Sequence, residues 1–322
     1  MASQNRLSRH DFLKLSGTAC LGMVLSSCSV PRPLTTTSTR TNTPPLTTAE
    51  TAAPHRKEVS IPDTEQWTLS SSAIGQEYNI FVALPHAYTI AIQAYPVIYV
   101  LDANAYFGIV TETVRSLNLF DDIPEIIVVG IGYPVDNFIA TLGFRTRDLT
   151  PTEDLGWYDR ELKPYFTAAP EDAGSGGAAQ FLQFIRKELI PLIDQNYRTV
   201  PGYNCLMGHS LGGLFDLYAL FNQSDTFQRY IIGSPSIWWD NATILDTAKE
   251  FAANKADVSA RVFISAGADE DPDMIVDLQK MVDVLHEKQS REFSLTNHIF
   301  EGEIHMSVIP ALISRGLRSA FA

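Results

Sequence analysis

The stretch Gly208-His209-Ser210-Leu211-Gly212, followed directly by Gly213, decides how this chain is interpreted. It fits the pattern G-x-S-x-G, in which the serine stands on a sharp turn between a strand and a helix. The flanking sequence predicts that setting, because 203–207 is a short apolar run and 214–221 is typical of a helix. Gly208 and Gly212 leave room for the two elements to pass closely. Ser210 is therefore the candidate nucleophile, and the backbone N–H of Leu211 is a candidate oxyanion donor.

Apolar runs and helical patterns alternate along the rest of the chain. Strands are expected at 67–72, 78–84, 96–101, 126–131, 203–207, 227–232, 262–265 and 293–300. Helices are expected at 106–119, 178–197, 214–221, 242–254, 272–288 and 307–321, with a kink at Pro191. Apolar strands separated by helices predict a mostly parallel sheet that is buried on both faces. The first two strands, with Gly75 between them, predict an antiparallel hairpin, so we expect a three-layer α/β sandwich over residues 58–322.

His305 is the candidate base. A serine hydroxyl is a weak nucleophile at neutral pH and needs an imidazole to accept its proton. Among the seven histidines, His305 stands in a turn after the last strand and before the final helix. The order serine, acid, histidine along the chain is that of the α/β-hydrolase arrangement. His209 is adjacent to Ser210, but its side chain is expected to point away from the hydroxyl.

The third catalytic group is expected after the strand at 262–265. Four carboxylates follow that strand, and the residues alone do not choose among them: Asp269, Glu270, Asp271 and Asp273. One of the four must accept the Nδ1–H of His305, and the others are ordinary charges at the start of a helix. A second oxyanion donor is expected from Ala103 and Asn104, in the loop after the strand at 96–101.

The N-terminal residues predict export. A basic segment and a short apolar run lead to Leu25-Ser26-Ser27-Cys28, which resembles a bacterial lipobox with Cys28 as the lipidated residue. The segment from Ser8 also resembles a twin-arginine signal, but the second arginine is His10, so the Sec and Tat routes both stay open. Residues 29–57 are rich in Thr, Ser and Pro, a composition that predicts a disordered tether. We expect a signal peptide at 1–28 and a protein anchored by lipid to the cell envelope, on the periplasmic side or at the surface.

The charge distribution excludes some partners. The chain has 24 Lys and Arg residues and 37 Asp and Glu residues. Residues 1–58 hold seven of the basic and three of the acidic residues. The body therefore has 17 basic and 34 acidic residues. A body this acidic repels phosphate, so we expect no nucleic-acid partner and no membrane contact except through the lipid anchor. Cys205 is the one cysteine of the body, and it is expected to be a small core residue. The predicted chemistry requires no metal or cofactor, and the oligomeric state stays open.

Several stretches carry a resemblance to the "Putative esterase" family of the α/β-hydrolases, and most closely to its enterochelin (siderophore) esterase-like bacterial group. They are 95–102 with 104–107, 129–134, 145–151, 208–214, 234–240 and the region of His305. The resemblance runs from about Gln66 to the C-terminus and implies the α/β-hydrolase fold with Ser210, Glu270 and His305 as nucleophile, acid and base. The chain departs from the family at Ala103, where relatives carry glycine.

Candidate substrate-binding residues stand at a strand end and in a long connection. Ser234, Trp238 and Trp239 follow the strand at 227–232, although both tryptophans cannot easily face inward. Arg145 lies in segment 133–177, a connection of more than 40 residues without an evident long helix, and connections of that length often form lids or walls. Arg145 and Arg147 could clamp an anionic substrate or pair with Asp148 and Glu153.

These features predict a serine esterase that cleaves carboxylic esters through an acyl-enzyme. Siderophore trilactones, acylated carbohydrates and small esters all fit as the small-molecule substrate, because one fold supports many chemistries. An acyltransferase on the same fold and a non-catalytic binding lipoprotein are the alternatives. A serine peptidase is a third and weaker one.

Overall fold

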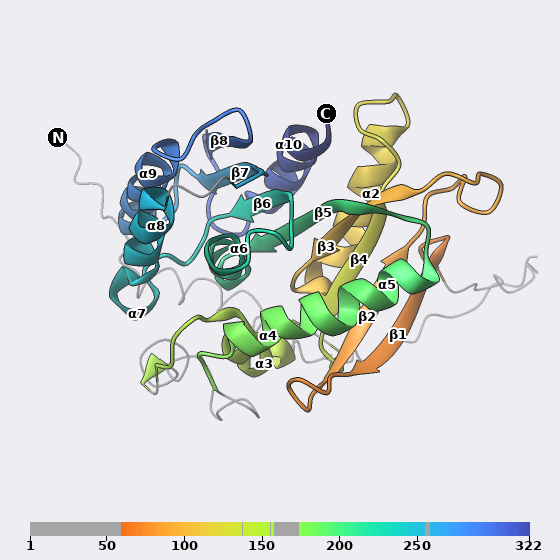
Figure 1. Ribbon diagram of the computed structural model, residues 1–322, viewed down its shortest axis with the longest axis horizontal. Helices are drawn as coiled ribbons and strands as arrows, with labels where there is room; N and C mark the ends of the chain where they lie inside the picture. The colour runs from red at the N-terminus through yellow and green to blue at the C-terminus, as the bar shows by residue number, and fades with distance from the viewer. Residues whose placement is uncertain (1–58, 137, 155, 158–173, 255–257) are drawn as a thin grey trace, which may run out of the picture. The chain divides into compact units, whose positions relative to one another are not determined.

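Eight strands form one mixed sheet in the computed structural model, which describes residues 59–136, 138–154, 156–157, 174–254 and 258–322 (Figure 1). The strand order is β1-β2-β4-β3-β5-β6-β7-β8. β1 pairs antiparallel with β2, β2 pairs antiparallel with β4, and all other neighbours are parallel. The strands are β1 (Thr64–Ser70), β2 (Glu77–Ala83), β3 (Tyr95–Val100), β4 (Ile127–Gly132), β5 (Thr199–His209), β6 (Arg229–Gly233), β7 (Ala260–Gly267) and β8 (Phe293–Phe300).

Helices cover both faces of this sheet (Figure 1). One face carries α2 (Ala103–Asn118) and α10 (Ile309–Phe321). The other carries α4 (Ala178–Phe184), the π-helical turn η3 (Ile185–Leu189), α5 (Ile190–Asn196), α6 (Leu211–Asn222), α8 (Ile244–Ala253) and α9 (Pro272–His286). The shorter helical segments are η1 (Ile139–Thr141), α3 (Leu142–Leu149) and α7 (Trp239–Ala242).

Alternate residues of the central strands feed two separate cores. On β5, Cys205 and Met207 pack with α2 and α10, whereas Leu206 packs with the helices of the opposite face. Every residue of β4 is buried, as expected for an inner strand of a sheet with helices on both faces. The predicted α/β-hydrolase sandwich with its antiparallel hairpin is therefore confirmed.

Residues 62–322 form one compact unit by themselves. The predicted signal peptide 1–28, with Cys28, and the predicted tether 29–57 lie outside the described residues. None of the helices in the described ranges is both long and apolar enough to cross a membrane.

Two irregular regions differ in detail from the expectation. A π-helical turn, η3, stands directly before α5, whose first turn contains Pro191, and the kink predicted there stays a prediction. A proline has no N–H to donate to the preceding turn, so the change of helical register costs no backbone hydrogen bond there. The described part of segment 133–177 contains η1 and α3, so this connection has more helical structure than its sequence indicates.

Candidate active site

Ser210 stands between β5 and α6 in a conformation that few non-glycine residues adopt. Its backbone angles are φ 63° and ψ −119°. The turn is held from several sides, since the N–H of Ser210 donates to the carbonyl of Gly233 at 2.9 Å and the carbonyl of Ser210 accepts from Leu214 and Ser236, each at 3.0 Å. Strain of this kind persists only where the surrounding structure enforces it, and it is concentrated at functional sites. The serine side chain is thus presented at the start of α6, whose first residue is Leu211.

The two glycines of the motif have different roles. A Cβ at Gly208 would lie 2.4 Å from the backbone carbonyl carbon of Gly212, a contact that backbone atoms cannot relieve without moving the helix. A Cβ at Gly212 would meet the carboxylate of Asp102 at 3.5 Å, which is ordinary van der Waals contact. The close approach of β5 and α6 therefore requires the absence of a side chain at Gly208, but not at Gly212.

Gly208→Ala is accordingly expected to lower the free energy of unfolding by about 1–3 kcal/mol and to reduce ester turnover, because the overpacked turn must shift. Gly212→Ala is the matched variant and is expected to be neutral or slightly stabilising, since alanine is the better helix former by up to about 1 kcal/mol. Chemical denaturation and turnover of both variants test this difference. Equal losses in the two variants would contradict it.

The structure brings His305 and Glu270 together. Nδ1 of His305 lies 2.8 Å from Oε2 of Glu270, and the Glu270 side chain is buried. The other carboxylate oxygen accepts hydrogen bonds from the Ser234 hydroxyl at 2.6 Å and from the Gly267 N–H at 2.7 Å. Burial opposes ionisation of Glu270, but the hydrogen bonds from His305, Ser234 and Gly267 outweigh burial and lower the pKa of Glu270. An ionised carboxylate held in this way orients the imidazole and stabilises its protonated form.

The remaining carboxylates of the stretch do not share this position. Asp271 is the N-cap of α9, and its side chain accepts the N–H of Asp273 at 2.9 Å. Asp269 and Asp273 are exposed. Among the four candidate carboxylates, the geometry therefore favours Glu270 as the partner of His305.

His305 lies at the elbow because its loop is tied to the end of β7. The imidazole ring of His305 is 4.5 Å, centroid to centroid, from the ring of His209, the residue before Ser210. The N–H of Asp269 donates to the carbonyl of Glu303 at 3.0 Å, and a Cβ at Gly267 would lie 2.2 Å from that same carbonyl oxygen. The absence of a side chain at Gly267 therefore lets the histidine loop approach the sheet.

Ser236 is a site residue that the sequence reasoning did not find. Its buried hydroxyl lies 3.3 Å from that of Ser210, and its N–H holds the Ser210 carbonyl. The only sequence signal was its place after the end of β6, shared with Ser234 and Trp238.

The predicted oxyanion loop follows β3. Asp102 adopts φ 54° and ψ 40°, and Ala103 begins α2, where helix geometry leaves backbone N–H groups without an intrahelical acceptor. The side chain of Asn104 is committed elsewhere: its Nδ2 donates to the carbonyls of Tyr133 and Val135, each at 3.0 Å, and its Oδ1 accepts the Tyr133 N–H at 2.8 Å. Only backbone N–H groups of this loop are therefore left to face an oxyanion.

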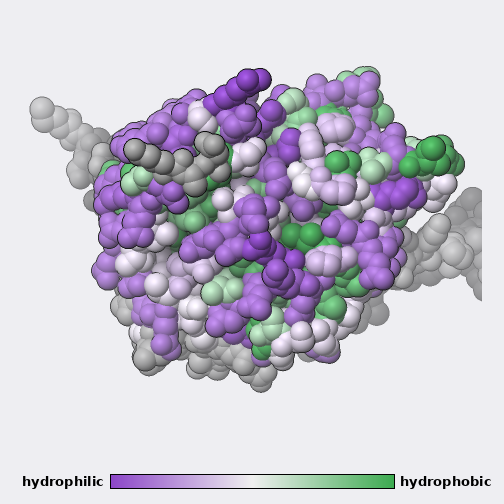
Figure 2. Space-filling model, in the orientation of Figure 1, coloured by the Kyte–Doolittle hydropathy of each residue, from purple (hydrophilic) through white to green (hydrophobic). Residues whose placement is uncertain are grey.

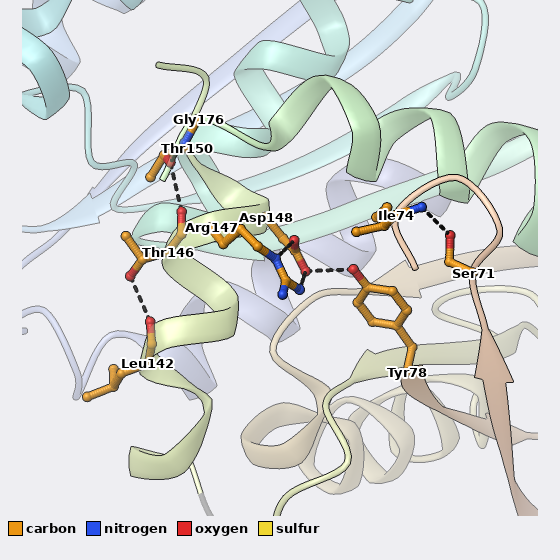
Figure 3. Close-up of polar contacts among 9 residues, drawn as sticks. All are labelled: Ser71, Ile74, Tyr78, Leu142, Thr146, Arg147, Asp148, Thr150 and Gly176. Atoms are coloured by element: carbon orange, nitrogen blue, oxygen red, sulfur yellow. Dashed lines mark hydrogen bonds and ion pairs between the residues drawn. The ribbon is translucent and has the colours of Figure 1, made fainter. Parts of the chain in front are cut away.

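Arg145 and Arg147 are engaged by carboxylates of the protein. Arg145 is buried and donates from Nε and from one terminal nitrogen to the two oxygens of Asp102, at 2.8 and 2.9 Å. Arg147 donates in the same bidentate way to Asp148, which also accepts the hydroxyl of Tyr78 at 2.8 Å (Figure 3). Two of the fork-shaped donors of Arg145 therefore hold the loop that starts α2, and its substrate-binding role stays a prediction. The pairing alternative was correct for Arg147 and Asp148.

The other predicted substrate-binding residues have different positions. Ser234 is buried and its hydroxyl donates to Glu270, so it supports the acid rather than lining a pocket. Trp239 is buried, and its indole N–H donates to the carbonyl and hydroxyl oxygens of Thr152, at 3.2 and 3.1 Å. Trp238 is partly exposed, which leaves it as the one tryptophan of the pair that can reach a ligand.

Another buried carboxyl, Asp216, lies on α6, the helix that follows Ser210. It is fully buried, and neither oxygen makes a hydrogen bond of normal geometry, although the Gly208 N–H lies nearby. Burial raises the pKa of Asp216 well above its usual range, and the charge of Asp102 adds to that rise. Because the pKa of Asp216 is raised in the native state, its contribution to the free energy of unfolding is fully present below its ordinary pKa. That contribution is lost as pH rises toward the pKa in the native state.

Asp216→Asn is therefore expected to raise the free energy of unfolding at pH 8 and to flatten its decline between pH 4 and pH 8, because the isosteric amide cannot ionise. Urea denaturation of both proteins at several pH values measures this. A variant that is less stable than the parent at pH 8 would show that the ionised carboxyl has a favourable partner.

No group of three or more His, Cys, Asp and Glu side chains that could hold a metal ion occurs within the described ranges. The catalytic candidates themselves are a hydroxyl, an imidazole and a carboxylate, which together support acyl transfer to a serine.

Comparison with known proteins identifies the family. The family model described as "Putative esterase" matches residues 71–308. The chain is 37% identical over 275 residues to the ferri-bacillibactin esterase BesA of Bacillus subtilis, across 81% of this chain and 90% of that protein. It is 32% identical over 293 residues to the siderophore triacetylfusarinine C esterase of Aspergillus fumigatus, across 82% and 94%. The fold matches that of the BES protein from Bacillus cereus with a TM-score of 0.74 and 34% identity, across 83% of this chain and 99% of that one. The chain therefore belongs to the "Putative esterase" family and is a carboxylic ester hydrolase.

Proposed function

We propose that this enzyme hydrolyses siderophore-type esters with Ser210 as nucleophile, His305 as general base and Glu270 as the acid that orients the base. Ser210 Oγ attacks the ester carbonyl carbon as its proton passes to His305. The backbone N–H groups of Leu211 and of the Ala103 loop stabilise the oxyanion, and His305 then gives its proton to the leaving alkoxide. Water, activated by the same imidazole, then hydrolyses the acyl-enzyme and releases the carboxylic acid product from Ser210. The contact of 2.8 Å between Glu270 and His305, with His305 against the elbow, carries this proposal.

The substrate class is supported by the relatives and by the rim of the site. The two relatives named above are esterases of ferri-bacillibactin and of triacetylfusarinine C. Ile304 and Met306, on either side of His305, are 45% and 48% exposed although both side chains are large and apolar. Such a rim suits a ligand with apolar or aromatic groups beside its ester bonds.

We further propose that the enzyme is exported, acylated at Cys28 and tethered to the membrane by residues 29–57. The lipobox-like sequence and the Thr, Ser and Pro-rich composition support this location. Mass spectrometry of the mature N-terminus tests it, because lipidation at Cys28 gives an acylated N-terminal peptide.

A substrate panel tests the esterase proposal. Ferric and iron-free siderophore lactones, feruloyl sugars and short and long acyl esters are compared by kcat/KM, with an added alcohol to detect acyl transfer. We expect the siderophore lactones to have the highest kcat/KM and water to be the main acceptor. A preference for carbohydrate esters would overturn the substrate class, and a dominant transfer product would favour the acyltransferase alternative.

A further inference from the structure

Two loops at the amino ends of the parallel strands expose large apolar side chains. Ile90 and Ile92 are 86% and 95% exposed, and Leu119 and Phe120 are 74% and 84% exposed. The loop between β2 and β3 and the loop between α2 and β4 project on the same side of the body, at the right and top right of Figure 1. Figure 2 shows hydrophobic surface where the first of these loops projects. Large apolar side chains exposed to water on neighbouring loops mark an interaction surface.

Polar contacts hold the first loop, residues 85–94, with its isoleucines outward. The guanidinium of Arg198 donates to the carbonyls of Gln93 at 3.2 Å and Ala91 at 3.1 Å, and also to the carbonyl of Tyr88. The same guanidinium lies 3.8 Å from the centre of the Tyr88 ring. The exposure of Ile90 and Ile92 is therefore a property of a braced loop, which cannot easily fold them inward.

The second loop is braced in a similar way and joined to the first. Asn118 Nδ2 donates to the carbonyl of Ile123 at 3.1 Å, which closes the turn that displays Leu119 and Phe120. Gln93 of the first loop donates to the Glu125 carboxylate at 2.8 Å. A small cleft lined by Pro85, Leu119 and Ile126, among others, lies between the two loops.

The chain enters the folded body beside these loops. The carbonyl of Pro62 accepts a hydrogen bond from Arg115 of α2 at 2.6 Å, and the Asp63 carboxylate lies 2.8 Å from Nδ1 of His86, at the start of the first loop. The catalytic candidates stand at the opposite side of the sheet, at the carboxyl ends of the parallel strands. A tether that reaches the body at Pro62 would therefore bring the two loops toward a membrane before the active site.

We propose that Ile90, Ile92, Leu119 and Phe120 form a docking surface for the lipid bilayer, in contrast to the expectation from net charge that the lipid anchor is the only membrane contact. The side chains insert at the interface, and the catalytic edge then faces away from the membrane, toward soluble substrate. This inference rests on the proposed lipid anchor only as the reason why a bilayer lies nearby. Its test uses protein without that anchor, so the two proposals can fail separately.

Charge indicates which lipid the surface prefers. Asp121 and Asp122 directly follow Phe120 and are exposed, and the body carries 17 basic against 34 acidic residues. Anionic headgroups repel such a surface, so binding must come from apolar insertion and must be stronger on zwitterionic vesicles.

The test measures insertion of single labelled positions. Residues 58–322 include all eight strands and both cores, and ester turnover of this body is measured first, as the check that it folds when it is made alone. Ile92→Cys and Phe120→Cys receive an environment-sensitive fluorophore, with Val276→Cys on α9 as the matched exposed apolar control. Cys205 is buried and does not compete for the label. We expect phosphatidylcholine vesicles to shift the emission at 92 and 120 to shorter wavelength, and quencher lipids to reduce it, with no change at 276.

Affinity gives a second measurement. Ile90→Ser/Ile92→Ser is expected to weaken partition to phosphatidylcholine vesicles by about tenfold or more, whereas Val276→Ser leaves it within about twofold of the parent. Ester turnover should stay unchanged in both. Labels at 92 and 120 that do not respond to vesicles would overturn the proposal. So would binding that anionic lipid strengthens and that Ile90→Ser/Ile92→Ser does not weaken. A spectral shift that rises with protein concentration in the absence of lipid would also overturn it, and would assign the surface to a second copy of the chain.

Discussion

Ser210→Ala is expected to lower kcat for ester hydrolysis by about 10⁴- to 10⁶-fold, because no acyl-enzyme can form without the hydroxyl. The fold should persist, since alanine keeps the Cβ and the backbone contacts to Gly233 and Ser236 remain. Turnover of p-nitrophenyl esters and far-UV circular dichroism measure the two parts of this expectation.

Ser236→Ala is the matched control for this variant. The Ser236 hydroxyl is only 3.3 Å from that of Ser210, which makes it an alternative nucleophile. We expect this variant to lose no more than about tenfold in kcat, the cost of a single neutral hydrogen bond of about 1 kcal/mol. A fluorophosphonate probe should label the parent and Ser236→Ala but not Ser210→Ala. Labelling of Ser210→Ala would refute the nucleophile assignment.

Glu270→Gln is expected to lower kcat by about 10²- to 10⁴-fold. The amide can present its N–H₂ group to Nδ1 of His305, which favours the wrong tautomer and no longer stabilises the imidazolium. Asp269→Asn and Asp271→Asn are the matched controls, because the first side chain is exposed and the second caps α9. They should retain turnover within about threefold, with any loss coming from the cap, worth about 1 kcal/mol of stability. A loss in Asp271→Asn as large as in Glu270→Gln would contradict this assignment of the acid.

Glu270→Gln is also expected to change how the free energy of unfolding depends on pH. The pKa of Glu270 is lowered in the fold, so its carboxylate stabilises the native state above its ordinary pKa of 4.5 and loses that contribution as pH falls through the folded value. Glu270→Gln should therefore reduce stability at pH 7 and weaken the dependence of stability on pH below 4.5. Urea denaturation of parent and variant between pH 3 and pH 7 measures both effects.

The nucleophile and the base could be predicted from local patterns. Ser210 lies in a five-residue motif whose strand and helix are evident on either side, and His305 follows the last strand in the order that the motif implies. Parallel strands bring their carboxyl ends to one edge, so residues at successive strand ends converge there even when they are far apart in sequence.

Local patterns were enough to predict the α/β layers, the sharp turn at Ser210 and the chain order of the catalytic candidates, because hydrophobic periodicity and glycine placement act over a few neighbouring residues. The carboxylate that meets His305 could not be predicted in this way, because four of them stand within five residues and their directions depend on how β7, β8 and α9 pack. The tertiary structure also assigned Arg145 to Asp102 and Ser234 to Glu270, contacts that join residues 43 and 36 positions apart. Hydrogen bonds over such separations depend on the register of distant strands, which no local pattern records.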